Sequence, residues 1–169
     1  MKTHQRTEGF SLIELLIVVA IIGIIASIAI PNLLASRRAA NEGSAQQSLR
    51  TIYSAEVTYQ NTAGMGQFGT LGNLGSQSMV DSVVAVAATT AKSGYLFTVN
   101  PVATTVGPPP TPALLWAYCL PSVTSGVGKT GTRRFAITED GVLRGDTTLT
   151  APANEAAING ATPMSPVGN

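Results

Sequence analysis

The chain has 169 residues, which is enough for one modest domain in addition to a membrane anchor. Ten basic and nine acidic side chains give a formal net charge of +1, and this balance argues against a nucleic-acid-binding surface or a strongly acidic partner. The single cysteine, Cys119, excludes an intramolecular disulfide, and we expect it to be a small buried side chain.

A short charged leader and a long apolar run open the chain. The run from Phe10 to Ile30 holds 21 residues, and as a helix with a rise of about 1.5 Å per residue it spans a hydrocarbon core of roughly 30 Å. Its one charged side chain is Glu14. Because a carboxylate costs about 3 kcal/mol near the centre of a membrane helix and less near an end, Glu14 is predicted to have a partner.

The series Gly9-Phe10-Ser11-Leu12-Ile13-Glu14 and the apolar run after it resemble the N-terminus of type IV pilins and of type II secretion pseudopilins. The resemblance covers about residues 6–40. It implies that residues 1–9 are a cytoplasmic leader, that a prepilin peptidase cleaves between Gly9 and Phe10, and that the same enzyme class N-methylates Phe10. Pro31 falls where these proteins often kink.

The same resemblance implies a homo-polymer, a helical filament whose core is formed by the apolar helices. In such a filament the carboxylate of Glu14 can pair with the new amine of Phe10 on a neighbouring subunit, which fixes the register of helices that would otherwise slide. The implied partners are the prepilin peptidase and methylase and the pilus or type II secretion assembly machinery. The implied location is the inner membrane, as a single-pass protein, and then a surface pilus or a periplasmic pseudopilus.

Two simpler interpretations of the N-terminus stay open. In the first it is an ordinary secretory signal, with a small-residue cleavage site at Ser27-Ile28-Ala29 and a mature chain that starts near Ile30. In the second it is a plain membrane anchor, which leaves Glu14 unexplained. Either would make the chain an anchored or secreted binding module, with the proline-rich segment 107–112 as its candidate ligand.

The helix is predicted to extend from residue 10 to residue 60, with residues 10–30 as the transmembrane part. Beyond Leu33, apolar positions fall at helical spacing on one face. That face carries Ala45, Leu49, Ile52, Glu56 and Tyr59, and the opposite face is predicted to carry Arg37, Glu42, Gln46, Gln47 and Arg50. The second half is therefore amphipathic and is predicted to pack on a domain.

Residues 61–169 are predicted to form a globular head. Glycines at short spacing between Gly64 and Gly75 indicate turns, and a short helix with Ser78 as its N-cap is predicted next. Strands are predicted at 95–99, 114–120, 134–139 and 142–144, the last two joined by the hairpin signal Asp140-Gly141. The chain after Asp146 has no periodicity and is predicted to be irregular. The fold class is therefore α+β, a long N-terminal helix packed on a small antiparallel sheet of three or four strands.

No residue pattern in the chain indicates an enzyme. The only histidine, His4, lies in the leader, so the mature chain has no imidazole base or ligand. Glu139, Asp140 and Asp146 are conceivable calcium ligands, since the major pseudopilins bind calcium in a C-terminal loop, but oxygen ligands are sparse and we expect solvated turn residues. We predict no catalytic residue, no metal site and no cofactor, and a structural role in a filament. Whether the filament is a pilus or a secretion pseudopilus stays open.

Overall fold

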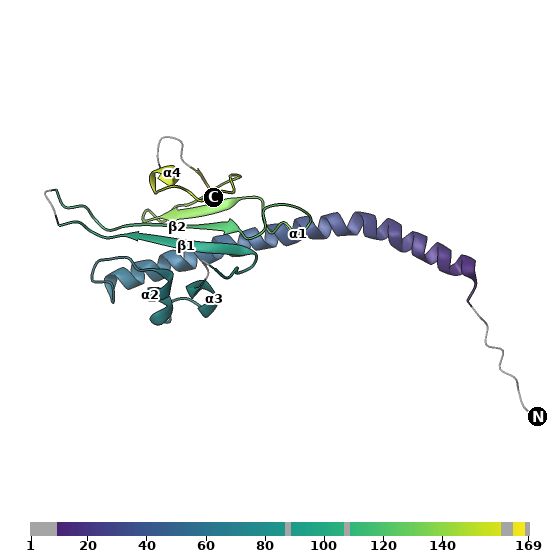
Figure 1. Ribbon diagram of the computed structural model, residues 1–169, viewed down its shortest axis with the longest axis horizontal. Helices are drawn as coiled ribbons and strands as arrows, with labels where there is room; N and C mark the ends of the chain where they lie inside the picture. Colours follow the sequence, from purple (N-terminus) through teal and green to yellow (C-terminus); the bar gives the residue numbers. More distant parts are fainter. Residues whose placement is uncertain (1–9, 87–88, 107–108, 160–163, 168–169) are drawn as a thin grey trace, which may run out of the picture. The chain divides into compact units, whose positions relative to one another are not determined.

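A computed structural model describes residues 10–86, 89–106, 109–159 and 164–167. The chain divides into two compact units, Met1–Ser36 and Arg37–Asn169. The helix α1, Leu12–Asn61, contributes to both (Figure 1). The long N-terminal helix is thereby confirmed, and its end at Asn61 agrees with the predicted boundary.

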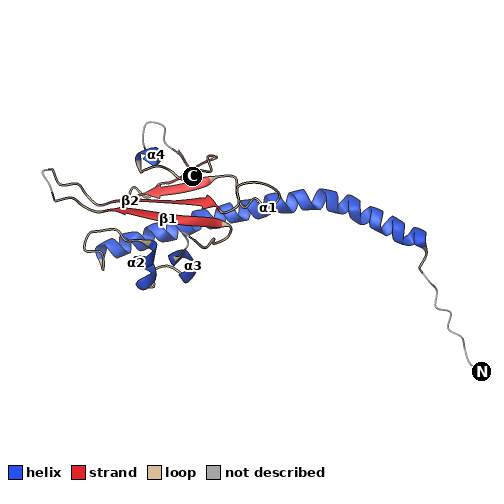
Figure 2. Cartoon of the chain, in the orientation of Figure 1, coloured by secondary structure: helices blue, strands red, loops and turns tan. Residues whose placement is uncertain are grey.

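The second unit contains an antiparallel sheet (Figure 2). Within the described residues its strands are β1 (Tyr95–Val102), β2 (Leu114–Pro121), β3 (Arg134–Thr138), β4 (Leu143–Asp146) and β5 (Ser165–Pro166), and they lie in the sheet in that order. Each strand pairs with the next, so the sheet is a simple meander. Four strands match the predicted ones, and β5 is one more than the sequence indicated.

The second half of α1 packs on one face of this sheet, as its apolar spacing predicted. Alternating residues of the strands point to that face, and Phe135 and Ile137 share it as expected. The core unites Ala45, Leu49, Ile52 and Ala55 of α1 with Tyr95, Phe97, Ala117, Cys119, Phe135, Ile137 and Leu143 of the strands. Cys119 is fully buried here, and burial holds the pKa of its thiol far above its ordinary value.

The strand β1 runs through Pro101, where the sequence predicted its end. Proline has no N–H to donate to a neighbouring strand, so it is disfavoured inside a sheet. The strand β1 lies at the edge of the sheet, where proline is tolerated. The residue before it, Asn100, still pairs with Trp116 of β2. An edge position therefore lets the strand continue to Val102.

Two predictions about the segment after α1 are wrong. The glycine-rich stretch forms the short helix α2, Leu71–Ser76, because Thr70 and Asn73 make a reciprocal capping box at its start. The next helix, α3, is Ser82–Ala85, and its N-cap is Asp81. Ser78 cannot cap it because its φ of 54° lies in the left-handed region, whereas a capping residue is extended.

The prediction of an irregular C-terminal tail is also wrong in part. The short helix α4, Ala156–Asn159, and β5 follow Asp146. Ile158 and Met164 are buried against Ala136, on the sheet face opposite to the main core. Isolated apolar residues without periodicity thus find a partner that only the folded sheet supplies.

Candidate processing and assembly site

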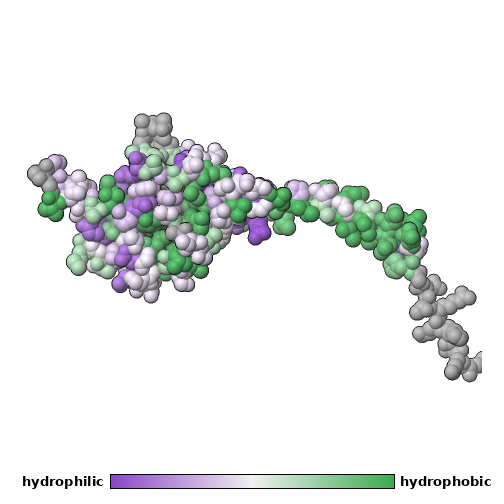
Figure 3. All heavy atoms as spheres, in the orientation of Figure 1, coloured by the Kyte–Doolittle hydropathy of each residue, from purple (hydrophilic) through white to green (hydrophobic). Residues whose placement is uncertain are grey.

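The described part of the first unit presents an exposed apolar helix surface. Phe10 is 81% exposed, and the large apolar side chains that follow are exposed as well (Figure 3). By length and composition α1 is able to cross a membrane, with a mean hydropathy of 2.9 over its most apolar window. The exposed series is Leu12, Ile13, Leu15, Leu16, Ile17, Val18, Val19, Ile21, Ile22, Ile24, Ile25, Ile28, Ile30 and Leu33.

The predicted processing junction lies at the edge of the described structure. Gly9 is outside the described residues, as is the predicted leader 1–9. Phe10 lies two residues before the first helical residue, Leu12. The first turn of α1 carries Glu14, so the structure places Phe10 and Glu14 at the same helix end.

The carboxylate of Glu14 caps this helix end. Its Oε2 accepts a hydrogen bond of 2.9 Å from the backbone N–H of Ser11. A carboxylate in the first turn is also favoured by the helix dipole, whose positive end lies here. In the single chain the Glu14 carboxylate therefore accepts a hydrogen bond from a backbone N–H at the start of α1. It points toward the N-terminal end of the helix, where a positively charged amine would stabilise its negative charge further.

Pro31 lies inside α1, and the helix continues through it to Asn61. Proline has no N–H, so the carbonyl one turn earlier, that of Ser27, lacks its usual intrahelical donor. The Ser27 hydroxyl donates to the carbonyl of Ile24 at 2.7 Å, one turn further back. Pro31 is therefore a point of reduced backbone bonding within an otherwise continuous helix.

A shallow groove of about 270 Å³ lies on the apolar helix. Leu12, Leu15, Leu16 and Val19 line it, and no polar side chain does. Such a groove between ridges of side chains is where a second helix packs.

The second unit contains a buried carboxylate that the sequence pattern placed on the wrong face of α1. Glu42 was predicted on the exposed face of α1 but is buried. Its Oε1 accepts hydrogen bonds of 2.7 Å from both the N–H and the hydroxyl of Thr132, and its Oε2 accepts one of 3.2 Å from Arg133. Glu42 precedes Ala45 by three residues, so it continues the buried stripe of Ala45, Leu49, Ile52 and Glu56, and that spacing was the missed signal.

Partial burial pushes the pKa of Glu42 upward, but the hydrogen bonds of Thr132 and Arg133 outweigh it and hold the pKa below its ordinary value. We therefore expect Glu42→Ala to lower the free energy of unfolding at pH 7 by about 1.5–3 kcal/mol, the range for hydrogen bonds to a charged group. A carboxylate with a lowered pKa stabilises the fold above its unfolded-state pKa, and this contribution is lost as the pH falls through the folded-state pKa. Denaturant unfolding of wild type and variant at pH 7 and below pH 4 measures this.

In Glu42→Gln the acceptor oxygen for Thr132 is retained and the charge is removed. The free energy of unfolding of Glu42→Gln at pH 7 should lie between those of the wild type and of Glu42→Ala. The glutamine variant should also lack the pH dependence that Glu42 contributes. Equal stability of all three proteins at pH 7 would show that the Glu42 contacts contribute nothing.

Three acidic residues near the β3–β4 hairpin were expected to be solvated. Asp140 is exposed, and Glu139 and Asp146 are half-buried. Asp146 also forms a paired contact with Arg134, at 2.7 and 2.8 Å, and Asp140 pairs with Arg144 at 2.6 Å. Arg134 and Asp146 face each other across β3 and β4, whereas Asp140 lies in the turn and pairs with Arg144 of β4. In the part of the chain that the structure describes, no group of three or more histidine, cysteine, aspartate or glutamate side chains could hold a metal ion.

Comparison with known proteins matches the N-terminal region. Residues 5–30 match the family described as the prokaryotic N-terminal methylation motif. The chain is 46% identical over 56 residues to the type IV major pilin protein PilA of Myxococcus xanthus, an alignment that covers 33% of this chain and 26% of that protein. It is equally identical over 56 residues to the type IV wide pilus major component PilA4 of Thermus thermophilus, which covers 33% of this chain and 43% of the relative.

A third relative extends further along the chain. The type II secretion system core protein G of Escherichia coli is 29% identical over 98 residues, which cover 57% of this chain and 66% of that protein. The chain thus spans less than two thirds of the length of each of these relatives. No solved structure matches. The chain therefore carries the prokaryotic N-terminal methylation motif and is related in sequence to type IV pilins and to the type II secretion core protein G.

Proposed function

We propose that this chain is the structural subunit of a type IV pilus-like filament. It is cleaved between Gly9 and Phe10, N-methylated at Phe10, and polymerised through the apolar part of α1. The observation that carries this proposal is the exposed apolar surface of α1 in the first unit, most of which lies within the matched methylation motif, residues 5–30. Membrane residence before assembly and a filament core after it both remove this surface from water.

The energy of that removal is large. Burial of one leucine, isoleucine or valine side chain contributes about 1.5–3 kcal/mol, so a series of more than ten such residues gives a strong driving force. A membrane and a bundle of identical apolar helices bury these side chains equally well. Transfer from one to the other therefore costs little, which suits a subunit that is stored in the inner membrane and then extracted.

Apolar burial does not define the axial register, because identical apolar helices can slide past one another. The Glu14 carboxylate supplies the register in our proposal. Cleavage creates a positive amine on Phe10, and Glu14 of one subunit pairs with that amine on its neighbour. An unpaired charge in this apolar core is strongly unfavourable, so only the register that forms the pair is stable. Pro31 lies at the C-terminal end of the apolar part of α1, where it allows the helix to bend.

We propose a structural and not an enzymatic role, with no metal and no cofactor. The partners are further copies of the chain, the inner membrane, the prepilin peptidase and methylase, and the pilus or type II secretion assembly machinery. A second candidate, a pseudopilin of a type II secretion system, is favoured by one observation. The match to the core protein G covers 98 residues and extends beyond the N-terminal motif.

The mature protein is expected to begin at Phe10 with one extra methyl group on its amine. The Gly9-Phe10 junction lies directly before α1, and a peptidase active site has to close around the small residue before the bond. Intact-mass measurement of the chain from membranes checks this. A start near Ile30 would instead indicate a secretory signal, and an uncleaved Met1 would indicate a plain anchor and a binding module.

The filament itself is tested by electron microscopy of sheared surface material, with mass spectrometry of the subunit. Surface filaments made of this chain support the pilus. If the chain stays with the membrane and its deletion blocks protein secretion, the pseudopilus is supported. Absence of both outcomes in cells that express the processed chain would overturn the proposal.

A further inference from the structure

Glu56 is a fully buried carboxyl on the inner face of α1. It has no exposed surface. Its Oε2 accepts one hydrogen bond of 2.8 Å, from the backbone N–H of Gly69, and its Oε1 is buried without a partner. The neutral acid leaves only its hydroxyl without a hydrogen-bond partner here, whereas the carboxylate buries a full negative charge, which is far more costly.

The surroundings offer this charge no compensation. The segment that follows Glu56, residues 57–80, contains no charged residue. On α1 the nearest cation in sequence, Arg50, is exposed, and beyond the segment Asp81 pairs with Lys92. The ionisable side chains of the apolar core cluster are Tyr53, Tyr59, Tyr95 and Cys119, and no neighbouring charge contributes to the pKa of Glu56. Burial therefore raises the pKa of Glu56 to about 7, and the Gly69 hydrogen bond offsets only part of that rise.

The contact of Glu56 depends on a close backbone approach. Gly69 lies against the ring of Tyr59, and a Cβ at Gly69 would come within 3.0 Å of the Tyr59 Cε1 atom. A side chain at position 69 would require the Tyr59 ring to shift. Glu56 thus ties Gly69 of the segment 62–80, which includes α2, to α1, in addition to the apolar contacts of Leu71 and Leu74.

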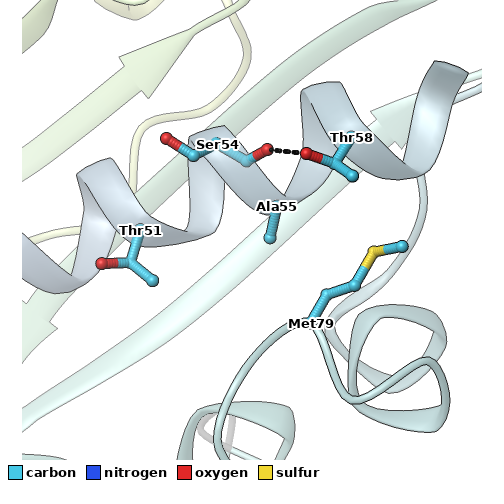
Figure 4. A pocket seen from close by; sticks show the side chains of 5 residues that line it. All are labelled: Thr51, Ser54, Ala55, Thr58 and Met79. Atoms are coloured by element: carbon cyan, nitrogen blue, oxygen red, sulfur yellow. Dashed lines mark hydrogen bonds between the residues drawn. The ribbon is translucent and has the colours of Figure 1, made fainter.

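The segment also contributes Leu71 and Leu74 to the main core, and open space lies beside it. An open pocket of about 290 Å³ is lined by Met79 and by the α1 residues Thr51, Ser54, Ala55 and Thr58 (Figure 4). Across the segment, a second cavity of about 240 Å³ lies between α2, Ala85 and the β1 residues Thr98 and Val99. Both ends of the segment have left-handed backbone, at Met65 and Gly66 and at Ser78, so the chain turns sharply on either side of α2. The segment therefore packs on the core through α2 and has open space on two sides.

We propose that Glu56 is a proton-dependent latch, whose neutral carboxyl holds the segment 62–80 against α1 and whose ionisation lets that segment open more often. This device belongs to the second unit and does not depend on filament formation. It makes exposure of the buried face of α1 a function of the surrounding pH.

The direction and size follow from linkage. The carboxyl has a pKa of about 7 when the segment is closed and an ordinary value of 4.5 when it is open to water. Between these values the closed form binds more protons, so raising the pH favours opening. The opening constant should rise roughly five- to sevenfold per pH unit between about 5 and 7 and level off above about pH 7.5.

Hydrogen exchange of the full-length chain in detergent micelles tests this. Amides of residues 70–80 are followed from about pH 5 to about pH 8, and their rates are divided by the intrinsic rates at each pH. In wild type the resulting opening constant should rise by more than about tenfold and then level off. In Glu56→Gln, which keeps an acceptor for Gly69 and cannot ionise, it should be independent of pH. Glu155→Gln, next to α4, is the matched control and should keep the wild-type profile.

Amides of β2 report whether each variant is folded. A pH-independent opening constant in wild type overturns the latch, and so does a wild-type profile in Glu56→Gln. If Glu56→Gln is unfolded, the wild-type protein decides the question by itself. A rise confined to residues 70–80 supports the latch, and an equal rise in β2 overturns it because the whole unit then opens.

Discussion

Replacement of Glu14 by alanine is expected to abolish filament assembly while the chain still inserts in the membrane. Loss of the carboxylate makes the span more apolar, so membrane residence is favoured. The amine of the neighbouring Phe10 loses its partner, and removal of one member of a buried ion pair costs about 3–5 kcal/mol. Even the lower value reduces the association constant of each subunit contact by more than about a hundredfold. The ratio of filament to membrane-retained subunit, by shearing and immunoblot, measures the effect.

Glu14→Gln should have a milder effect, because the amide keeps a hydrogen-bond acceptor and loses the charge. Glu155→Ala removes a carboxylate beside α4 of the second unit and should leave filament yield unchanged. N-terminal processing is measured in parallel, so that an uncleaved chain is not mistaken for an assembly defect. Wild-type filament yield from Glu14→Ala would refute the pairing role and leave Glu14 as a helix cap alone.

A fragment that begins at Leu34 is expected to be a soluble, folded monomer, and Leu49→Ala within it should lose about 2–5 kcal/mol of stability. The fragment omits the exposed apolar helix and keeps the part of α1 whose Leu49 is fully buried in the core. Removing its side chain leaves a cavity between α1 and the sheet. Size exclusion establishes the monomer, and urea denaturation followed by circular dichroism gives the free energies.

Val127→Ala is the control for this substitution, since Val127 is 80% exposed. It should change stability by less than about 0.5 kcal/mol. Reducing agent should leave the melting temperature of the fragment unchanged, because its one cysteine has no intramolecular partner. An aggregated or unfolded fragment would show that the second unit needs the apolar helix in order to fold.

The sequence alone was sufficient for features that depend on neighbouring residues. The apolar run after Phe10, with Glu14 as its only charge, is a property of contiguous residues, so its length and hydropathy could be measured without a structure. The same holds for the helical stripe that includes Leu49 and for the alternation that puts Phe135 and Ile137 on one face. Helix and strand periods are local geometry, and they were sufficient to predict a long helix and a small antiparallel sheet, whereas the order of the strands in the sheet came from the structure.

Tertiary structure decided the features that depend on residues far apart. Glu42 has its partners 90 residues later in the chain, at Thr132, and only the folded sheet brings them together. The apolar Ile158 lacks a periodic neighbourhood, and its burial depends on a sheet face that forms elsewhere. Glu56 could be placed on the inner face from its spacing, but its isolation from compensating charge could not. That isolation depends on how an uncharged, glycine-rich segment folds back over α1, and local sequence patterns do not encode how such a segment packs.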